Sequence, residues 1–272
     1  MKARLLTAAI GIPAAVIILI LGESFHWIMH VIMALITAIM VFELLSAKKL
    51  HNNPFVLIPC LLFTLAQPAI ILLNAGLFPL FIFVIVMCLI MITNNTRVNY
   101  SDITFALIGT LLVSWGMCSI LIMPPIYYNY YAFFFVICLG VPWCADAGAY
   151  FSGVFLGQHK LCPNVSPNKT VEGFIGGIAA GTLSALIIGF VFSFLYPKAE
   201  FNYGILLIIG ALSSIISVLG DLTFSLIKRS CKIKDYGSFF PGHGGFLDRF
   251  DSVIFTAPLV YFIGTFFRIF LV

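Results

Sequence analysis

The chain alternates long apolar runs with short polar connections. An α-helix needs about 20 apolar residues to cross the hydrocarbon core of a bilayer. Runs of suitable length lie near 5–22, 26–46, 54–73, 77–93, 103–123, 131–153, 173–196, 204–224 and 252–271. We therefore expect an all-α, polytopic integral membrane protein with about nine transmembrane helices, the third and fourth joined by an Asn74-Ala75-Gly76 turn.

The basic residues divide unevenly between the two sides that nine spans define. One side holds only Lys198 and Arg268 of the 14 Lys and Arg residues. The other side, which includes the N-terminus, holds Lys2, Arg4, Lys48, Lys49, Arg97, Lys160, Lys169, Lys228, Arg229, Lys232, Lys234 and Arg249. Because Lys and Arg gather in cytoplasmic loops, we expect the N-terminus in the cytoplasm and the C-terminus outside.

Composition supports a membrane protein. Apolar residues make up 62% of the chain, charged residues 9%, and the mean hydropathy is +1.13. A soluble domain is about 45–50% apolar and about 25% charged, so lipid has to cover much of this surface. The seven Cys form no C-x-x-C pair, which excludes a zinc ribbon and offers no disulfide framework. We expect no nucleic-acid partner.

Two longer polar connections, 157–172 and 225–251, both fall on the cytoplasmic side. We divide the chain into an N-terminal transmembrane region, 1–130, and a C-terminal transmembrane region, 131–272, which carries both loops and the chemistry. The site should therefore face the cytoplasm at the inner surface of a cell membrane.

Few acidic residues lie within the spans, and each one is costly there. Asp146 lies inside the sixth span and Asp221 near the end of the eighth. Ionisable groups at such depth face a polar cavity with a partner, so both are candidate functional residues. Glu43, shortly before Lys48 and Lys49, is equally well explained as an ion-paired surface carboxylate or as a site residue.

The segment 225–251 combines features of a phosphate and metal site. Four basic residues within seven positions, Lys228, Arg229, Lys232 and Lys234, could bind anionic groups. Gly244 and Gly245 lie in a Gly-x-Gly-Gly run, whose backbone amides could form a phosphate nest. Asp248 and Asp251 are three residues apart at a helix start and share one face, as do Asp221 and Ser225, four apart. Carboxylates beside phosphates suit Mg²⁺.

A second polar element, Ser166 to Gly173, opens the seventh span. Thr170 and Glu172 suit the start of a helix, where simple capping would explain them. Lys169, beside the glycine-rich helix start, could equally bind a phosphate. The element is not a Walker A motif, which needs G-x-x-x-x-G-K-[ST].

At these residues the sequence resembles a known family. The run S-L-I-K-R-S-C-K-I-K-D-Y-G-S-F-F-P-G-H-G-G-F-L-D-R-F-D at 225–251 resembles the signature of the phosphatidate cytidylyltransferases, or CDP-diacylglycerol synthases. D-A-G-A-Y-F-S-G at 146–153 and S-P-N-K-T-V-E-G at 166–173 also resemble segments of that family. The resemblance is strong over most of 140–256 and elsewhere rests on architecture.

The resemblance implies a reaction and a set of roles. CTP and phosphatidic acid would give CDP-diacylglycerol and pyrophosphate. The reaction would require Mg²⁺, and a second cation could share the site. The enzyme would be a homodimer embedded in membrane lipid. Asp221, Asp248 and Asp251 match the metal-binding acids. The phosphates would be contacted by Lys228, Arg229, Lys234 and Arg249. His243 would donate a hydrogen bond to a phosphate, serve as a hinge or, as the third choice, act as a general base. The remaining substrate contacts would come from Ser225, Asp235, Gly244, Gly245, Lys169, Thr170, Glu172 and Asp146.

Two other functions compete with this one. An ion-coupled transporter would also use intramembrane Asp146 and Asp221, although no inverted repeat is visible. A different lipid nucleotidyltransferase or phosphotransferase would use the same basic and acidic cluster.

Overall fold

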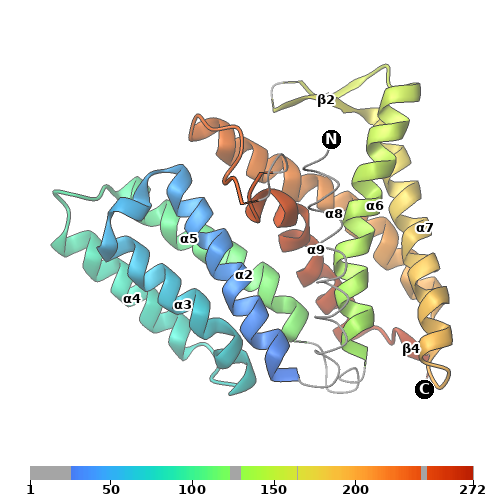
Figure 1. Ribbon diagram of the computed structural model, residues 1–272, viewed down its shortest axis with the longest axis horizontal. Helices are drawn as coiled ribbons and strands as arrows, with labels where there is room; N and C mark the ends of the chain where they lie inside the picture. The colour runs from blue at the N-terminus through green and yellow to red at the C-terminus, as the bar shows by residue number, and fades with distance from the viewer. Residues whose placement is uncertain (1–25, 123–129, 164, 240–243, 272) are drawn as a thin grey trace. The chain divides into compact units, whose positions relative to one another are not determined.

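The computed structural model describes residues 26–122, 130–163, 165–239 and 244–271 (Figure 1). The span expected at 5–22 lies outside these residues. The chain divides into two compact units, Met1–Ile122 with Ser230–Phe250, and Met123–Arg229 with Asp251–Val272.

Helices dominate the described residues. They are α2 (His26–Ala47), α3 (Pro54–Leu72), α4 (Phe78–Thr93), α5 (Tyr100–Cys118), α6 (Tyr131–Leu156), α7 (Val171–Leu195), α8 (Tyr203–Ser230) and α9 (Leu247–Phe266), with short 3₁₀ turns at Leu50–Asn52 and Ser119–Leu121. Short strands β1 (Lys160–Cys162) and β2 (Ser166–Thr170) pair antiparallel, as do β3 (Glu200–Phe201) and β4 (Phe270–Leu271).

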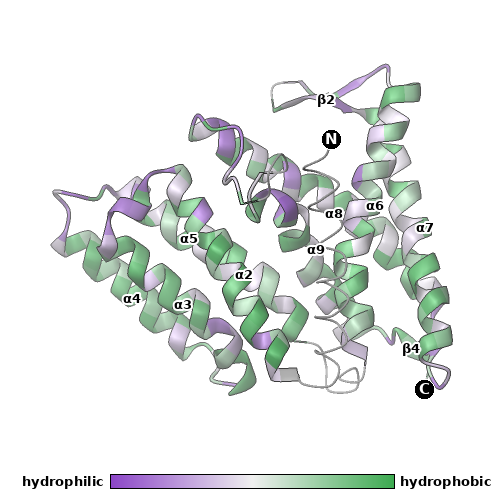
Figure 2. Cartoon of the chain, in the orientation of Figure 1, coloured by the Kyte–Doolittle hydropathy of each residue, from purple (hydrophilic) through white to green (hydrophobic). Residues whose placement is uncertain are grey.

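Six of these helices are long and apolar enough to cross a membrane: those at Trp27–Ala47, Pro54–Leu72, Tyr100–Leu121, Tyr131–Leu156, Val171–Leu195 and Tyr203–Ser230. Hydrophobic residues cover them and polar residues gather in the connections (Figure 2). The expectation of an all-α membrane protein is confirmed. The run at 77–93 forms a shorter, 16-residue helix. The run at 252–271 is helical only as far as Phe266, in α9, which begins earlier, at Leu247, and its last residues lie in β4.

The two polar loops are shorter than expected. In the first, Lys160–Cys162 and Ser166–Thr170 pair as the antiparallel strands β1 and β2. In the second loop, α8 continues to Ser230, so Ser225, Lys228 and Arg229 are helical rather than part of a loop. Charged residues are tolerated in these last turns because Lys and Arg near a helix C-terminus complement its dipole.

In the first unit, α2 packs against α3 and α5, and α3 against α4 (Figure 1). Local chemistry sets the helix starts: the Asn53 side chain accepts a hydrogen bond from the Phe55 amide at 3.1 Å, and Pro54 occupies the first helical position. The turn expected at 74–76 is present, with positive φ at Asn74 and Gly76. A buried hydrogen bond of 3.1 Å between Thr64 and Ser114 joins α3 to α5.

In the second unit, α6 and α7 lie side by side along their length (Figure 1). Small residues allow this approach: a Cβ on Gly148 would overlap the Ala180 methyl group and lie 3.1 Å from the Gly176 carbonyl oxygen. At one end, Phe133 of α6 packs against Phe201 and Phe270, so the β3–β4 ladder is joined to the helices by aromatic rings.

We predict that Gly148→Ala destabilises the protein, because the added methyl group has to push α6 away from α7. Overpacking of this kind costs about 1–3 kcal/mol. Gly140→Ala is the matched control on the same helix, since its Cβ would meet only the end of the flexible Ile188 side chain, at 3.1 Å. The midpoint of thermal unfolding in detergent should fall for Gly148→Ala alone. Equal midpoints for the two variants would contradict the close α6–α7 packing.

Candidate functional site

The predicted site residues fall in both units. Asp146, Lys169, Thr170, Glu172, Asp221, Ser225, Lys228, Arg229 and Asp251 belong to the second unit. Lys234, Asp235, Gly244, Gly245, Asp248 and Arg249 belong to the first. His243 lies outside the described residues.

An ion pair in the second unit joins two predicted site residues that are 52 positions apart. Lys169, in β2 just before α7, pairs with the Asp221 carboxylate on α8. Ser225, one turn further along α8, donates a hydrogen bond to the other Asp221 oxygen at 3.3 Å. The Lys169 Nζ atom is itself buried, so the 24% exposure of that side chain comes from its other atoms, whereas the Asp221 side chain is 28% exposed.

Asp251 lies on α9 close to the same place on α8. A Cβ on Gly220 would lie 2.8 Å from the Asp251 carbonyl oxygen, so the absence of a side chain lets the two helices touch. The Asp251 carboxylate is buried and accepts a hydrogen bond of 2.7 Å from the Ser252 amide. It interacts electrostatically with Asp221, Asp146 and Lys228. The negative charges of Asp221 and Asp146 therefore oppose a charge on Asp251, and the positive charge of Lys228 favours it.

The connection before α7 is organised by the two residues that were candidates for capping. The Thr170 hydroxyl oxygen accepts a hydrogen bond of 3.1 Å from the Gly173 amide, which confirms it as the helix N-cap. Glu172 binds the His159 ring nitrogen at 2.6 Å and accepts from the Gln158 amide at 3.1 Å. These bonds close the β1–β2 hairpin onto the start of α7, and so hold Lys169 in place beside Asp221.

In the first unit, Asp248 is held by backbone amides. Its Oδ2 atom accepts from Tyr236 at 2.8 Å and from Gly245 at 3.0 Å. Gly244 has φ +84°, and a Cβ there would lie 2.8 Å from the same oxygen. A left-handed backbone and close contact both explain why a glycine is needed at this position.

Backbone amides at the end of the glycine run and just after it bind carboxylates of the protein itself. The Gly245 amide donates to Asp248, and the next two amides, of Phe246 and Leu247, donate to the Glu43 carboxylate on α2 at 3.1 and 2.8 Å. Glu43 is thus neither a surface ion pair nor exposed: it is buried at 7% exposure. Sequence reasoning left its role open because its partners are more than 200 residues away.

The remaining predicted phosphate ligands are accessible. Lys228 and Arg229 occupy the last turn of α8 in the second unit. Lys234 and Arg249 are exposed in the first, as is Asp235, one of the other predicted substrate contacts.

Among the described residues, no three His, Cys, Asp or Glu side chains are gathered as a metal site. The donor chemistry nevertheless fits Mg²⁺, which commonly takes only one or two protein carboxylates and completes its shell with water and substrate phosphates. Asp221 and Asp251 offer such a pair of hard oxygen ligands.

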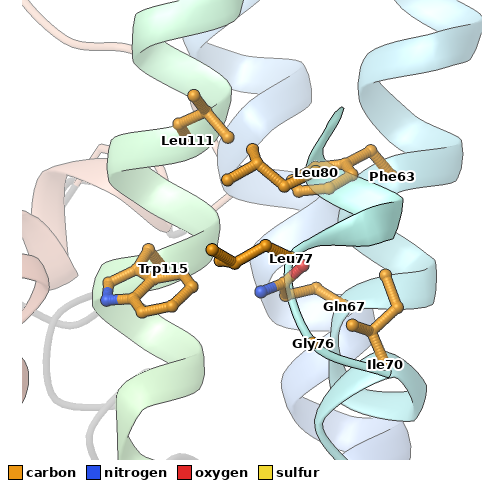
Figure 3. A pocket seen from close by; sticks show the side chains of 8 residues that line it. All are labelled: Phe63, Gln67, Ile70, Gly76, Leu77, Leu80, Leu111 and Trp115. Carbon is orange, nitrogen blue, oxygen red and sulfur yellow. The ribbon is translucent and has the colours of Figure 1, made fainter. Parts of the chain in front are cut away.

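A pocket of about 330 Å³ lies elsewhere in the first unit (Figure 3). It contains none of the predicted site residues. Apart from Gln67 its walls are apolar, formed by Phe63, Ile70, Gly76, Leu77, Leu80, Leu111 and Trp115. It does not have the polar groups that phosphate chemistry requires.

Its long apolar helices make this protein a helical membrane protein. The chain matches the model of the cytidylyltransferase family over residues 2–267, and it belongs to this family. It is 34% identical over 276 residues to a phosphatidate cytidylyltransferase of Bacillus subtilis, covering 97% of each chain. It is also 33% identical over 267 residues to the enzyme of that name in Staphylococcus haemolyticus, covering 96% of this chain and 97% of the relative.

We predict that Gly244→Ala destabilises the segment around Asp248, because strained backbone and the contact with Oδ2 act together. A left-handed conformation costs an L-residue roughly 1–2 kcal/mol. Gly76→Ala is the control: Gly76 also has positive φ, at +64°, but nothing lies within 4 Å of its Cβ position. Thermal unfolding in detergent should show a larger loss for Gly244→Ala. If the midpoint of thermal unfolding falls equally for both variants, the contact with Asp248 does not contribute to stability.

Proposed function

We propose that the protein transfers CMP from CTP to phosphatidic acid, giving CDP-diacylglycerol and pyrophosphate. The observation that carries the proposal is the match of nearly the whole chain to relatives with that name, together with the Lys169, Asp221 and Asp251 cluster. Family membership favours this enzyme over an ion-coupled transporter.

The reaction is an in-line substitution at phosphorus. A phosphate oxygen of phosphatidic acid forms a bond to the α-phosphorus of CTP, and the bond from that phosphorus to the bridging oxygen breaks to release pyrophosphate. A phosphate monoester is already ionised near neutral pH, so the chain need not supply a strong base. Its residues act by orienting the two substrates and compensating charge.

Asp221 and Asp251 would hold Mg²⁺, with Asp248 one turn before Asp251 on the same face of α9. The ion would neutralise charge on the phosphates and help to align them, and a second cation could share the site. The ion pair of Lys169 with Asp221 is compatible with metal binding, because the lysine ammonium can neutralise the carboxylate until a metal ion replaces it. Lys169 would then turn to a phosphate.

The other cations would bind the remaining phosphate charge. Lys228 and Arg229 at the end of α8, with Lys234 and Arg249, would contact the triphosphate or the lipid phosphate. His243 would donate to a phosphate or act as a hinge. Ser225 and Asp146 would support Asp221 and Asp251, while Asp235, Gly244, Gly245, Thr170 and Glu172 would shape the substrate pocket.

The location follows from the substrates. Phosphatidic acid remains in the bilayer with its headgroup at the interface, and CTP is water-soluble. Nine spans with a cytoplasmic N-terminus would place the C-terminal region 131–272 so that its site opens to the cytoplasm. As the family resemblance implies, the protein would act as a homodimer in the bacterial cell membrane and take part in phospholipid biosynthesis.

The test is the fate of individual phosphorus atoms of CTP. Purified protein with phosphatidic acid, Mg²⁺ and α-³²P-labelled CTP should give label in a chloroform-soluble product. The same reaction with γ-³²P-labelled CTP should leave the label in the aqueous phase as pyrophosphate. Label from the γ position in lipid would identify a phosphotransferase instead, and no lipid label from either position would refute nucleotidyl transfer. Removal of Mg²⁺ with EDTA should stop the reaction.

We predict that Asp221→Asn and Asp251→Asn each lower kcat by on the order of 10²-fold or more, because an amide binds Mg²⁺ more weakly than a carboxylate. Asp248→Asn should have a similar effect while membrane insertion remains intact. Glu200→Gln, on the exposed surface of β3, is the control and should keep full activity. Near-normal turnover by Asp221→Asn or Asp251→Asn would show that the metal ligands lie elsewhere.

A further inference from the structure

Glu43 on α2 binds the start of α9 from a distant part of the sequence. Its two carboxylate oxygens accept from the Phe246 amide at 3.1 Å and from the Leu247 amide at 2.8 Å. All these groups belong to the first unit. The first amides of a helix have no partner within the helix, and they carry the positive end of its dipole. A carboxylate from another helix therefore takes the place of a local cap.

Two glycines lie against the Glu43 carboxylate. A Cβ on Gly237 would overlap its Oε1 atom, and a Cβ on Gly245 would overlap both carboxylate oxygens. Glycines on two sides thus form a slot that admits the carboxylate. Charged residues are almost never fully buried unless they are paired, and here the pairing groups are the amides of α9.

The same turn carries Asp248. Gly245 both contacts Glu43 and donates its amide to Asp248 Oδ2, which also accepts from the Tyr236 amide. Glu43 and Asp248 therefore both bind the short turn from Gly245 to Asp248. Asp251 follows one turn later on the same helix.

We propose that Glu43 is a positioning residue, which fixes the first turn of α9 so that Asp248 and Asp251 are presented for metal and phosphate binding. This inference rests on the metal-binding role of these two aspartates in the proposed function. Outer groups that orient ligating carboxylates typically change metal affinity or activity by about 10–100-fold when removed.

The test compares Glu43→Gln with Asp102→Asn. Asp102 is a matched control in the same unit, because it also serves a helix N-terminus: it accepts from the Asn99 amide at 3.3 Å at the start of α5 and pairs with Lys48 at 2.7 Å. A glutamine keeps the size of Glu43 but offers one oxygen and an NH₂ group that cannot accept from an amide. Both variants should lose some thermal stability in detergent.

Only Glu43→Gln should change the metal response. We expect its Mg²⁺ concentration for half-maximal label transfer to rise about 10-fold, with a fall in kcat of about the same size at saturating CTP. Asp102→Asn should leave both unchanged. Amide hydrogen exchange, which needs no activity, should become faster in peptides spanning 236–250 for Glu43→Gln, and near 99–103 for Asp102→Asn.

Three results separate the possibilities. Unchanged Mg²⁺ dependence and kcat in Glu43→Gln would overturn the positioning role, even if exchange at 236–250 increases, because Glu43 would then serve stability alone. No lipid label with the wild-type protein would instead refute the proposed function.

If Glu43→Gln does not fold, Gly237→Ala tests the same contact, because it displaces the carboxylate without removing it. It should raise the Mg²⁺ requirement in the same direction, and a wild-type requirement would count against the proposal.

Discussion

A carboxylate in an apolar protein needs a donor or a cation beside it, and this constraint organises the described parts of the chain. Desolvation disfavours an isolated charge far more than it disfavours a paired one. Glu43 is compensated by the amides of Phe246 and Leu247, Asp248 by those of Tyr236 and Gly245, and Asp221 by Lys169. Each pairing joins segments that are distant in sequence or ties a loop to a helix start, so electrostatic compensation also sets the backbone path.

These pairings differ in whether the partner of the carboxylate can be exchanged, and the exchangeable ones are available to bind a metal ion or a substrate. Glu43 binds backbone amides, which cannot move away without unwinding the helix start, and it is therefore a permanent part of the fold. Lys169 binds Asp221 through a flexible side chain, and a lysine is a point charge that can be exchanged for a metal ion. In the proposed function, rigid amide pairs orient the carboxylates, while exchangeable lysine and arginine pairs respond to the substrate.

Close packing of helices depends on the absence of side chains at chosen positions. Gly148 admits α7 beside α6, and Gly220 admits the backbone of α9 beside α8 at Asp251. In lipid, where apolar side chains gain little from contact with one another, such close approach is a main source of helix association. Glycine thus contributes to the second unit twice, first to its stability and then to the position of a predicted metal ligand.

The sequence alone determined the class of fold, the approximate helices and most of the candidate residues. Length and apolarity of the runs are local properties, and the fixed spacing of Lys228, Arg229, Asp248 and Asp251 identified the family resemblance without a structure. The capping by Thr170 was also predictable, because an N-cap acts within three residues. The last turn of α8 was missed because charged residues resemble a loop when only hydropathy is considered.

Only the tertiary structure decided which partner each charge has. The Lys169–Asp221 pair and the Glu43 contacts join residues about 50 and 200 positions apart, and no local pattern encodes such pairings. The phosphate nest expected at the glycine run stays a prediction, whereas the amides of Gly245, Phe246 and Leu247 bind carboxylates of the protein itself. Which anion binds them depended on the position of α2, and packing brings the carboxylate of Glu43 there.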